Sequence, residues 1–334
     1  LDFMKEIGFS GRPLSIMMIA DKKDSLSTAT TIFSGSTFGI DFNGNQISIK
    51  LRDRLEELSQ KAAQEALFEG TNNGSTIWYE GAADGIKGYT KPFGYGGPIL
   101  EVEAVLVNDA HLIYAVNFDS DGDFLPVDSF QDVFDAGLDI VLDTAAGTGG
   151  DFATTDLLRV ASIDPGKYAT CIAEGTFKLE SSPAGKVTVN FTVGATSADC
   201  TPAAIAIKLL EDRGGYTSAD YVATSFSQLD TDTSSIVSQI YVSDDSSILD
   251  CISKVLGDVG ANLIVNYEGK FQVVQLKNPY SESSVFTFHN NNTIRSKFSG
   301  GIQKISSRDP GEGLPVKELK VAYKQIYTVQ DESD

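Results

Sequence analysis

The chain has 334 residues, of which 41% are hydrophobic and 10% aromatic, so it can form sizeable cores and global disorder is excluded. Its length predicts two or three domains. The formal net charge of -20 excludes a protein that wraps nucleic acid, because such binding neutralises phosphates with lysine and arginine. Acidity is still compatible with a channel through which DNA passes without being held.

Three cysteines, Cys171, Cys200 and Cys251, are far apart in the sequence and form no C-x-x-C pair. With only His111 and His289 to supply imidazole, we expect neither a structural zinc site nor a disulfide framework, and synthesis in a reducing compartment. No apolar run is long enough for a membrane helix, so stable membrane insertion is not expected. The start of the chain shows no secretory pattern. Because the chain lacks an initiator Met and ends just after a strand-like run, we expect it to be a fragment of a longer protein.

The first region, residues 1–72, is predicted to be an N-terminal β domain. Asn43-Gly44 stands between two alternating runs, which is the strongest local signal for a β-hairpin. Residues 52–70 have a helix-favouring composition. A loop rich in glycine and asparagine at 70–74 then indicates a boundary.

The second region, residues 73–195, is predicted to be β-rich with glycine-rich loops. Residues 175–193 alternate apolar and polar positions on both sides of Pro183–Gly185, which predicts a hairpin with its turn at these residues. The Gly/Thr-rich stretch 143–156 resembles a flexible surface loop. No lysine follows its glycines as a nucleotide-binding P-loop requires.

The third region, residues 196–334, is predicted to be an α+β domain with a helix packed on a small sheet. One helix is expected to begin at Thr201-Pro202 and to end at Gly214-Gly215, and a second carries Val222, Phe226 and Leu229. Residues 235–243 predict a strand. A third helix is expected between a Ser246/Ser247 cap and Gly260, followed by two strands around Glu268-Gly269, and its apolar stripe consists of Ile248, Leu249, Ile252, Val255, Leu256 and Val259.

Asp119, Asp121 and Asp123 alternate in the way that opens a calcium-binding loop. The EF-hand pattern then requires glycine at its sixth position and glutamate at its twelfth, whereas here glycine comes fourth and Phe130 stands twelfth. We therefore favour a solvated hairpin turn for the three aspartates and keep them as weak metal candidates.

The glycine-rich stretch 80–98 is locally basic in an acidic chain and contains Tyr89, Phe93 and Tyr95. It lacks the G-x-G-x-x-G pattern that would cradle phosphate before a helix. A scaffold turn is the better interpretation, with glycines adopting positive φ and Pro92 and Pro98 fixing its direction.

No catalytic constellation is evident. Ser36 is flanked by glycines, but its spacing does not match the G-x-S-x-G elbow. Carboxylates are so abundant that no pair of them indicates a glycosidase site. The sequence therefore predicts neither an enzyme nor a cofactor.

Three segments taken together resemble a known family. Residues 51–60 (LRDRLEELSQ), 79–108 (including IKGYTKPFGYGGP) and 177–191 (FKLESSPAGKVTVNF) are similar, in the same order, to large tail-tip or baseplate hub proteins of long-tailed, siphovirus-like bacteriophages. The third region is more loosely similar to the hub domain of contractile tails and secretion-system spikes. The resemblance implies a multi-domain architecture, mostly β, in which barrel- or sandwich-like domains precede a helix-on-sheet domain.

The resemblance implies a structural virion protein at the distal end of the tail, assembled in the host bacterial cytoplasm. Such a protein closes the tail tube as a homotrimer and connects distal tail and tail-tube proteins to fibres or spike. Carboxylates lining its lumen would repel phosphate, so that DNA passes without specific binding. No catalytic residue is implied.

Two alternatives stay open. A receptor- or carbohydrate-binding tail module would use exposed Trp78, Tyr89 and Tyr95 to stack on sugar faces. A cell-wall hydrolase would depend on one of the many Asp or Glu residues.

Overall fold

The computed structural model describes residues 11–19, 27, 29–43, 46–72, 79–233, 236–275, 277, 327 and 328. The chain divides into two compact units, Leu1–Gln275 with Ile326–Asp334 and Leu276–Gln325, and all described residues except Lys277 belong to the first. The described part is mostly β, as the sequence predicts. None of its helices is long and apolar enough to span a membrane.

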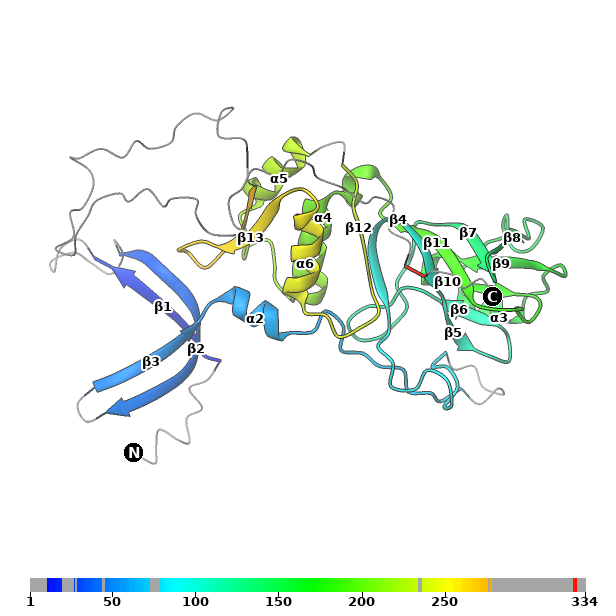
Figure 1. Ribbon diagram of the computed structural model, residues 1–334, viewed down its shortest axis with the longest axis horizontal. Coiled ribbons are helices and arrows are strands. Elements are labelled where there is room, and N and C mark those ends of the chain that lie inside the picture. Colours follow the sequence, from blue (N-terminus) through cyan, green and yellow to red (C-terminus); the bar gives the residue numbers. More distant parts are fainter. Residues whose placement is uncertain are drawn as a thin grey trace, which may run out of the picture. The chain divides into compact units, whose positions relative to one another are not determined.

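The largest sheet of the described residues is a curled sheet of nine strands, at the right of Figure 1. Its strand order is β12-β4-β11-β7-β8-β9-β10-β6-β5, and every pair is antiparallel except β8 with β9. The strands are β4 (Phe93–Glu103), β5 (Val105–Asn108), β6 (Ile113–Ala115), β7 (Ser129–Asp135), β8 (Leu138–Leu142), β9 (Lys167–Cys171), β10 (Thr176–Leu179), β11 (Val187–Val193) and β12 (Gln239–Val242).

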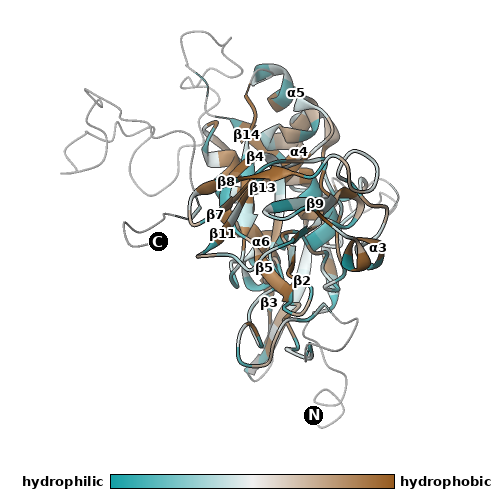
Figure 2. Ribbon diagram, turned by 90° about the vertical axis from the view of Figure 1, so that its right-hand side faces the viewer, coloured by the Kyte–Doolittle hydropathy of each residue, from teal (hydrophilic) through white to brown (hydrophobic). Residues whose placement is uncertain are grey.

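Helices pack beside the β12 end of this sheet (Figure 1). They are α4 (Pro202–Lys208), continued by the π-helical turn η4 (Leu209–Arg213), then α5 (Ala223–Asp232) and α6 (Ile248–Gly257), with the hairpin β13 (Ala261–Val265) and β14 (Phe271–Gln275). One continuous cluster of buried apolar residues runs from β4 and β11 through α4 and α6 to β14. The predicted middle and third regions thus share a core, and β4 and β13 are among the elements with hydrophobic colouring in Figure 2.

Helices α4 and α6 begin where the sequence predicts, whereas α5 begins at Ala223, so the predicted Val222 lies just before it. Thr201 caps α4, with its hydroxyl accepting from Ala204 N, and Ser247 caps α6 by accepting from Asp250 N. The predicted stripe of α6 faces the core, although Leu249 and Val259 are only partly buried. The helix ends at Gly257, three residues before the predicted Gly260. Pairing of β13 with β14 around Glu268-Gly269 confirms the last predicted hairpin.

The N-terminal strands form a separate sheet in the order β1-β2-β3, namely β1 (Pro13–Met18), β2 (Thr30–Asn43) and β3 (Gln46–Arg52). Antiparallel pairing of Asn43 with Gln46 confirms the predicted hairpin, whose turn residues 44 and 45 lie outside the described residues. Helix α2 (Arg54–Gln60) follows directly, capped by Asp53. Arg54 Nη1 lies 2.9 Å from Asp220 Oδ1 and thereby connects α2 to the helical layer.

Two predictions of local structure are wrong. Strands β10 and β11 exist but do not pair as a hairpin, because β10 pairs with β6 and β9 while β11 pairs with β4 and β7. The Asp135 carboxylate accepts the N–H groups of Ala184 and Gly185, which fixes the segment between the two strands against β7. The predicted helix at 52–70 stops at Gln60, because the next residues pair elsewhere: Ala63 N donates to Ser246 O. Tertiary hydrogen bonds override local helix propensity here.

The glycine-rich stretch only partly forms the predicted turn. Residues 83–88 turn, but Phe93–Pro98 belong to strand β4, between β12 and β11. Strand β4 needs a glycine at position 96, because the φ of this residue is +81° and a Cβ built there would lie 2.2 Å from Ser238 O. Glycine therefore allows the backbone before β12 to approach β4 closely.

We predict that Gly96→Ala strongly destabilises the protein, whereas Gly88→Ala has a smaller effect. Both glycines have φ near +80°, but a Cβ at Gly88 meets nothing within 4 Å. Left-handed backbone alone costs about 1–2 kcal/mol, and the clash at Gly96 should raise the loss of unfolding free energy to about 3 kcal/mol or more. Urea denaturation of the two variants measures the difference, and equal losses would show that β12 does not need this close approach.

Candidate functional site

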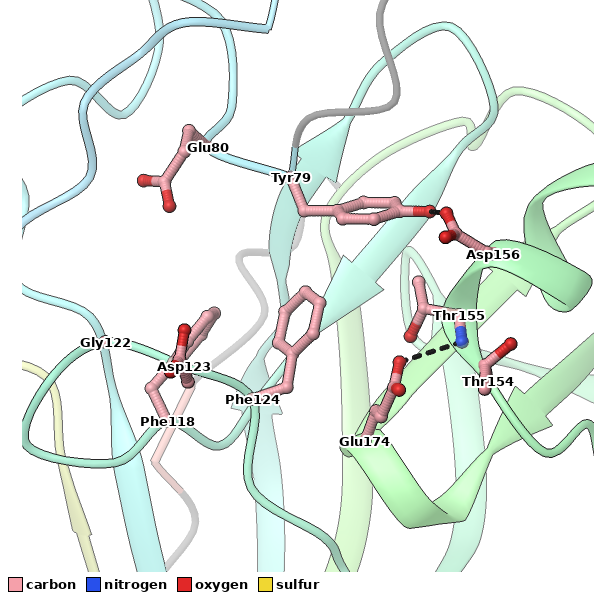
Figure 3. Close-up of a pocket in the computed structure, with 10 residues that line it drawn as sticks. All are labelled: Tyr79, Glu80, Phe118, Gly122, Asp123, Phe124, Thr154, Thr155, Asp156 and Glu174. Carbon is pink, nitrogen blue, oxygen red and sulfur yellow. Dashed lines mark hydrogen bonds between the residues drawn. The ribbon is translucent and has the colours of Figure 1, made fainter.

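An open cavity of about 580 Å³ lies in the first unit. Its ten lining residues come from four separate segments, shown as sticks in Figure 3: Tyr79, Glu80, Phe118, Gly122, Asp123, Phe124, Thr154, Thr155, Asp156 and Glu174. This volume is in the range of small-ligand sites. We refer to it as the acidic–aromatic pocket.

Aromatic rings form one wall of the pocket. Phe118 and Phe124 have ring centroids 5.3 Å apart, and Tyr79 lies 5.7 Å from Phe124. Phe118 is fully buried and meets Phe68 edge to face on its other side. Packing behind the wall therefore holds Phe118 in place, while Tyr79 and Phe124 remain partly exposed toward the cavity.

Hydroxyls and carboxylates at the start of helix α3 (Thr155–Val160) and at the end of the 3-10 turn η2 (Ile172–Glu174) form the facing wall. Glu174 Oε2 accepts the backbone N–H of Thr155 at 2.8 Å, which joins the two elements. The Tyr79 hydroxyl donates to Asp156 Oδ1 at 2.7 Å. Burial, followed by this bond to Asp156, raises the pKa of Tyr79, so its hydroxyl stays protonated at neutral pH.

Lys91, in the K-P-F-G motif, organises the pocket from behind. Its side chain is 7% exposed, and Nζ donates to Glu80 Oε1 at 2.7 Å and to the carbonyl of Gly122 at 3.0 Å. The ammonium also lies 5.5 Å from the ring centroids of both Phe68 and Phe118. One buried cation thus fixes two lining residues from different segments, so one of the two lysines of the glycine-rich stretch serves packing.

The three candidate aspartates lie in a turn at the edge of the pocket. Asp119 Oδ1 accepts the backbone N–H groups of Asp121 and Asp123, and Phe118 pairs with Phe124 across the turn. Of the three, Asp123 lines the cavity. Within the described residues there is no group of three or more His, Cys, Asp or Glu side chains arranged to hold a metal ion.

The structure corrects the residues proposed for stacking on sugars. Tyr95 is 3% exposed, because it lies in β4 and its hydroxyl donates to Asp212 at 3.0 Å, so it is unable to present a ring to a ligand. Tyr89 is exposed but does not line the pocket, and Trp78 lies outside the described residues. Sequence reasoning missed Tyr79, Phe124 and Glu174; the one available signal was the pair of phenylalanines that flank the three aspartates.

The other residues that the sequence analysis considered do not line the pocket. Ser36 lies in β2 and donates its hydroxyl to Glu57. The three cysteines are buried and free, and burial raises the pKa of Cys251 to about 11, so its thiol stays protonated. His111 lies after β5, whereas His289 is outside the described residues.

Comparison with known proteins gives no family. No protein-family model matches the chain, and no curated protein matches it significantly. The chemistry of the site therefore has to be inferred from its own geometry: a hollow with aromatic faces on one side, hydrogen-bond acceptors on the other, and no basic residue in its lining.

We predict that Lys91→Met lowers the free energy of unfolding by about 3 kcal/mol, because it leaves the Glu80 carboxylate without its buried cation. Adding Glu80→Gln should restore part of this loss, since the uncompensated charge is then removed. The exposed pair Lys50–Asp41 is the control, and Lys50→Met should change stability by less than about 1 kcal/mol. Denaturant titrations measure all of these variants, and purely additive effects of Lys91 and Glu80 would disprove the coupling.

Proposed function

We propose that this protein is a structural component of a bacteriophage tail tip, in which copies of the chain assemble into a ring around a hollow axis. The resemblance of residues 51–60, 79–108 and 177–191 to tail-tip hub proteins supports the place in the virion. One feature of the structure supports the assembly: the β1-β2-β3 sheet has an apolar face that the described part of the chain covers only partly.

The pairing register assigns the side chains of this sheet to its two faces. Ile40 pairs with Ile49 and Ile16 with Phe33, and alternation places these residues on one face. That face, which we call the apolar face, consists of Leu14, Ile16, Phe33, Ile40, Ile47, Ile49 and Leu51. The opposite face carries mainly polar side chains, and includes the Lys50–Asp41 ion pair and one exposed ring, Phe38, which lies under the Arg52 guanidinium. Its polar residues are Ser15, Ser34, Ser36, Asp41, Ser48, Lys50 and Arg52.

The described part of the chain covers the apolar face only partly: Ile16, Ile47 and Ile49 are exposed, and Leu14, Phe33, Ile40 and Leu51 are partly buried. Ile47 is 61% exposed and Ile49 46%, and no residue of the apolar face belongs to, or packs against, the clusters of buried apolar residues within the described part. An antiparallel sheet normally packs its apolar face on a core and leaves the polar face in water. Large uncovered apolar surfaces of this kind mark interfaces.

Charge favours a second copy of the chain as the occupant. Within 11–52, the described residues contain three basic side chains (Arg12, Lys50 and Arg52) and one acidic side chain (Asp41), whereas the whole chain carries -20. The sheet as a whole is therefore complementary in charge to the acidic remainder of another copy, although Lys50 and Arg52 lie on its polar face. A contact between two different surfaces of identical chains is heterologous, and it closes into a ring when the rotation between copies permits.

We expect native mass spectrometry and negative-stain electron microscopy of the intact gene product to show a threefold ring. Ile49→Lys should reduce it to monomers, because burying one isoleucine contributes roughly 2 kcal/mol to each interface, or more than about tenfold in affinity. The matched control is Ser48→Lys, one residue away on the polar face, which should leave the ring intact. A wild-type monomer at micromolar concentration, or a ring that persists in Ile49→Lys, would contradict assembly through this face.

The place in the virion is tested separately. Gold-labelled antibodies against residues 79–233 should decorate purified particles of the source phage at the end of the tail distal to the head. Labelling along the tail, on the capsid, or on no particle at all would argue against a tail-tip component even if the isolated protein forms rings.

A further inference from the structure

The acidic–aromatic pocket has no part in the proposed assembly, so its chemistry raises a separate question. Its volume of about 580 Å³ accommodates a ligand the size of one or two sugar rings. The lining is divided: ring surfaces of Tyr79 and Phe124 lie on one side, and Thr154, Asp156 and Glu174 on the other (Figure 3). A ligand that fits must be apolar on one face and polar at its edges.

The charges of the pocket exclude an anionic ligand. The lining holds four carboxylates and no basic residue. Two cations beside the lining are already engaged: the Lys91 ammonium is bonded to Glu80 and to the carbonyl of Gly122, and the Arg159 Nε lies 3.7 Å from Asp156 Oδ1. A phosphate or carboxylate entering the pocket would therefore meet four carboxylates and no cation in the lining itself.

The polar wall needs hydrogen-bond donors from its ligand. An ionised carboxylate can accept hydrogen bonds but cannot donate them. Glu174 Oε2 already accepts the backbone N–H of Thr155. Asp156 Oδ1 accepts a hydrogen bond from the Tyr79 hydroxyl, which also holds the tyrosine ring in one orientation beside the cavity. Asp123 stands exposed on the opposite rim, where its carboxylate faces water. Several acceptors around one hollow favour a ligand with several hydroxyl groups.

From this arrangement we propose that the pocket binds a neutral saccharide ring, with its C–H face against Tyr79 and Phe124 and its hydroxyls donating to Glu174, Asp156 and Asp123. A pyranose combines an apolar face with a rim of donors, which matches both walls. Aromatic side chains supply large, rigid contact area for such a face. The inference rests on the pocket alone and goes beyond the proposed assembly.

Isothermal titration calorimetry of the full chain with glucose, galactose and N-acetylglucosamine tests this proposal. We expect at least one sugar to bind with a dissociation constant in the millimolar range or tighter. Tyr79→Leu should weaken that binding by about tenfold or more, and Glu174→Gln by a smaller factor. The control Tyr89→Leu removes an exposed tyrosine outside the pocket and should leave affinity within about twofold.

Several outcomes would overturn the proposal: no heat with any of the three sugars at about 20 mM, unchanged affinity in Tyr79→Leu, or binding of choline in place of sugars. Near-ultraviolet circular dichroism checks that each variant is folded. If Tyr79→Leu does not fold, Asp123→Asn at the exposed rim replaces it and should weaken binding at least threefold. Ile49→Lys should bind sugar like the wild type, so failure of ring assembly and failure of the pocket are told apart.

Discussion

Strand β4 makes the contacts on which both parts of the central fold depend. It pairs with β12 on one side and with β11 on the other, so the helical layer and the curled sheet meet along a single backbone. The guanidinium of Arg213 reinforces this junction, because it stacks 3.9 Å from the centroid of the Phe93 ring and donates to the Tyr95 hydroxyl and to the carbonyl of Phe118. Arg213 is 3% exposed, and such a buried cation requires these acceptors and ring faces to be held in place.

Phe118 lies between two buried cations, the guanidinium of Arg213 and the ammonium of Lys91. Arg213 bonds its carbonyl, and the Lys91 ammonium lies over its ring. The turn that follows Phe118 carries the acidic rim of the pocket, so the shape of the pocket depends on the same junction that joins helices to sheet. A chain of net charge -20 thus uses its few buried cations as fixed points around which aromatic residues pack.

The sequence predicted correctly those helix and hairpin features that depend on residues close together in the chain. The stripe of α6, its Ser247 cap and the strand pairing at Asn43 follow from periodicity and turn chemistry, and the structure confirms them. The predictions from sequence were wrong where a strand pairs, or a backbone group bonds, with residues far away in the chain. Nothing local shows that β10 pairs with β6, or that Ala63 bonds to Ser246 and so ends a helical run. The pocket is lined by residues of four separate segments, and of the candidate residues named from the sequence only Asp123 lines it. The reason is that cavities depend on non-local packing.

The charge of the chain bears on why an assembly would form a ring and not a symmetric dimer. Lys50 and Arg52 lie on the polar face, so they would not meet their own copies if two apolar faces came together. They would instead favour contact between the sheet as a whole and the acidic remainder of a neighbour, over about 8 Å at physiological salt. Each copy would then use two different surfaces, which is the condition for cyclic closure. The contact would weaken with salt only at its exposed rim, because screening acts on the charges and leaves the buried isoleucines unaffected.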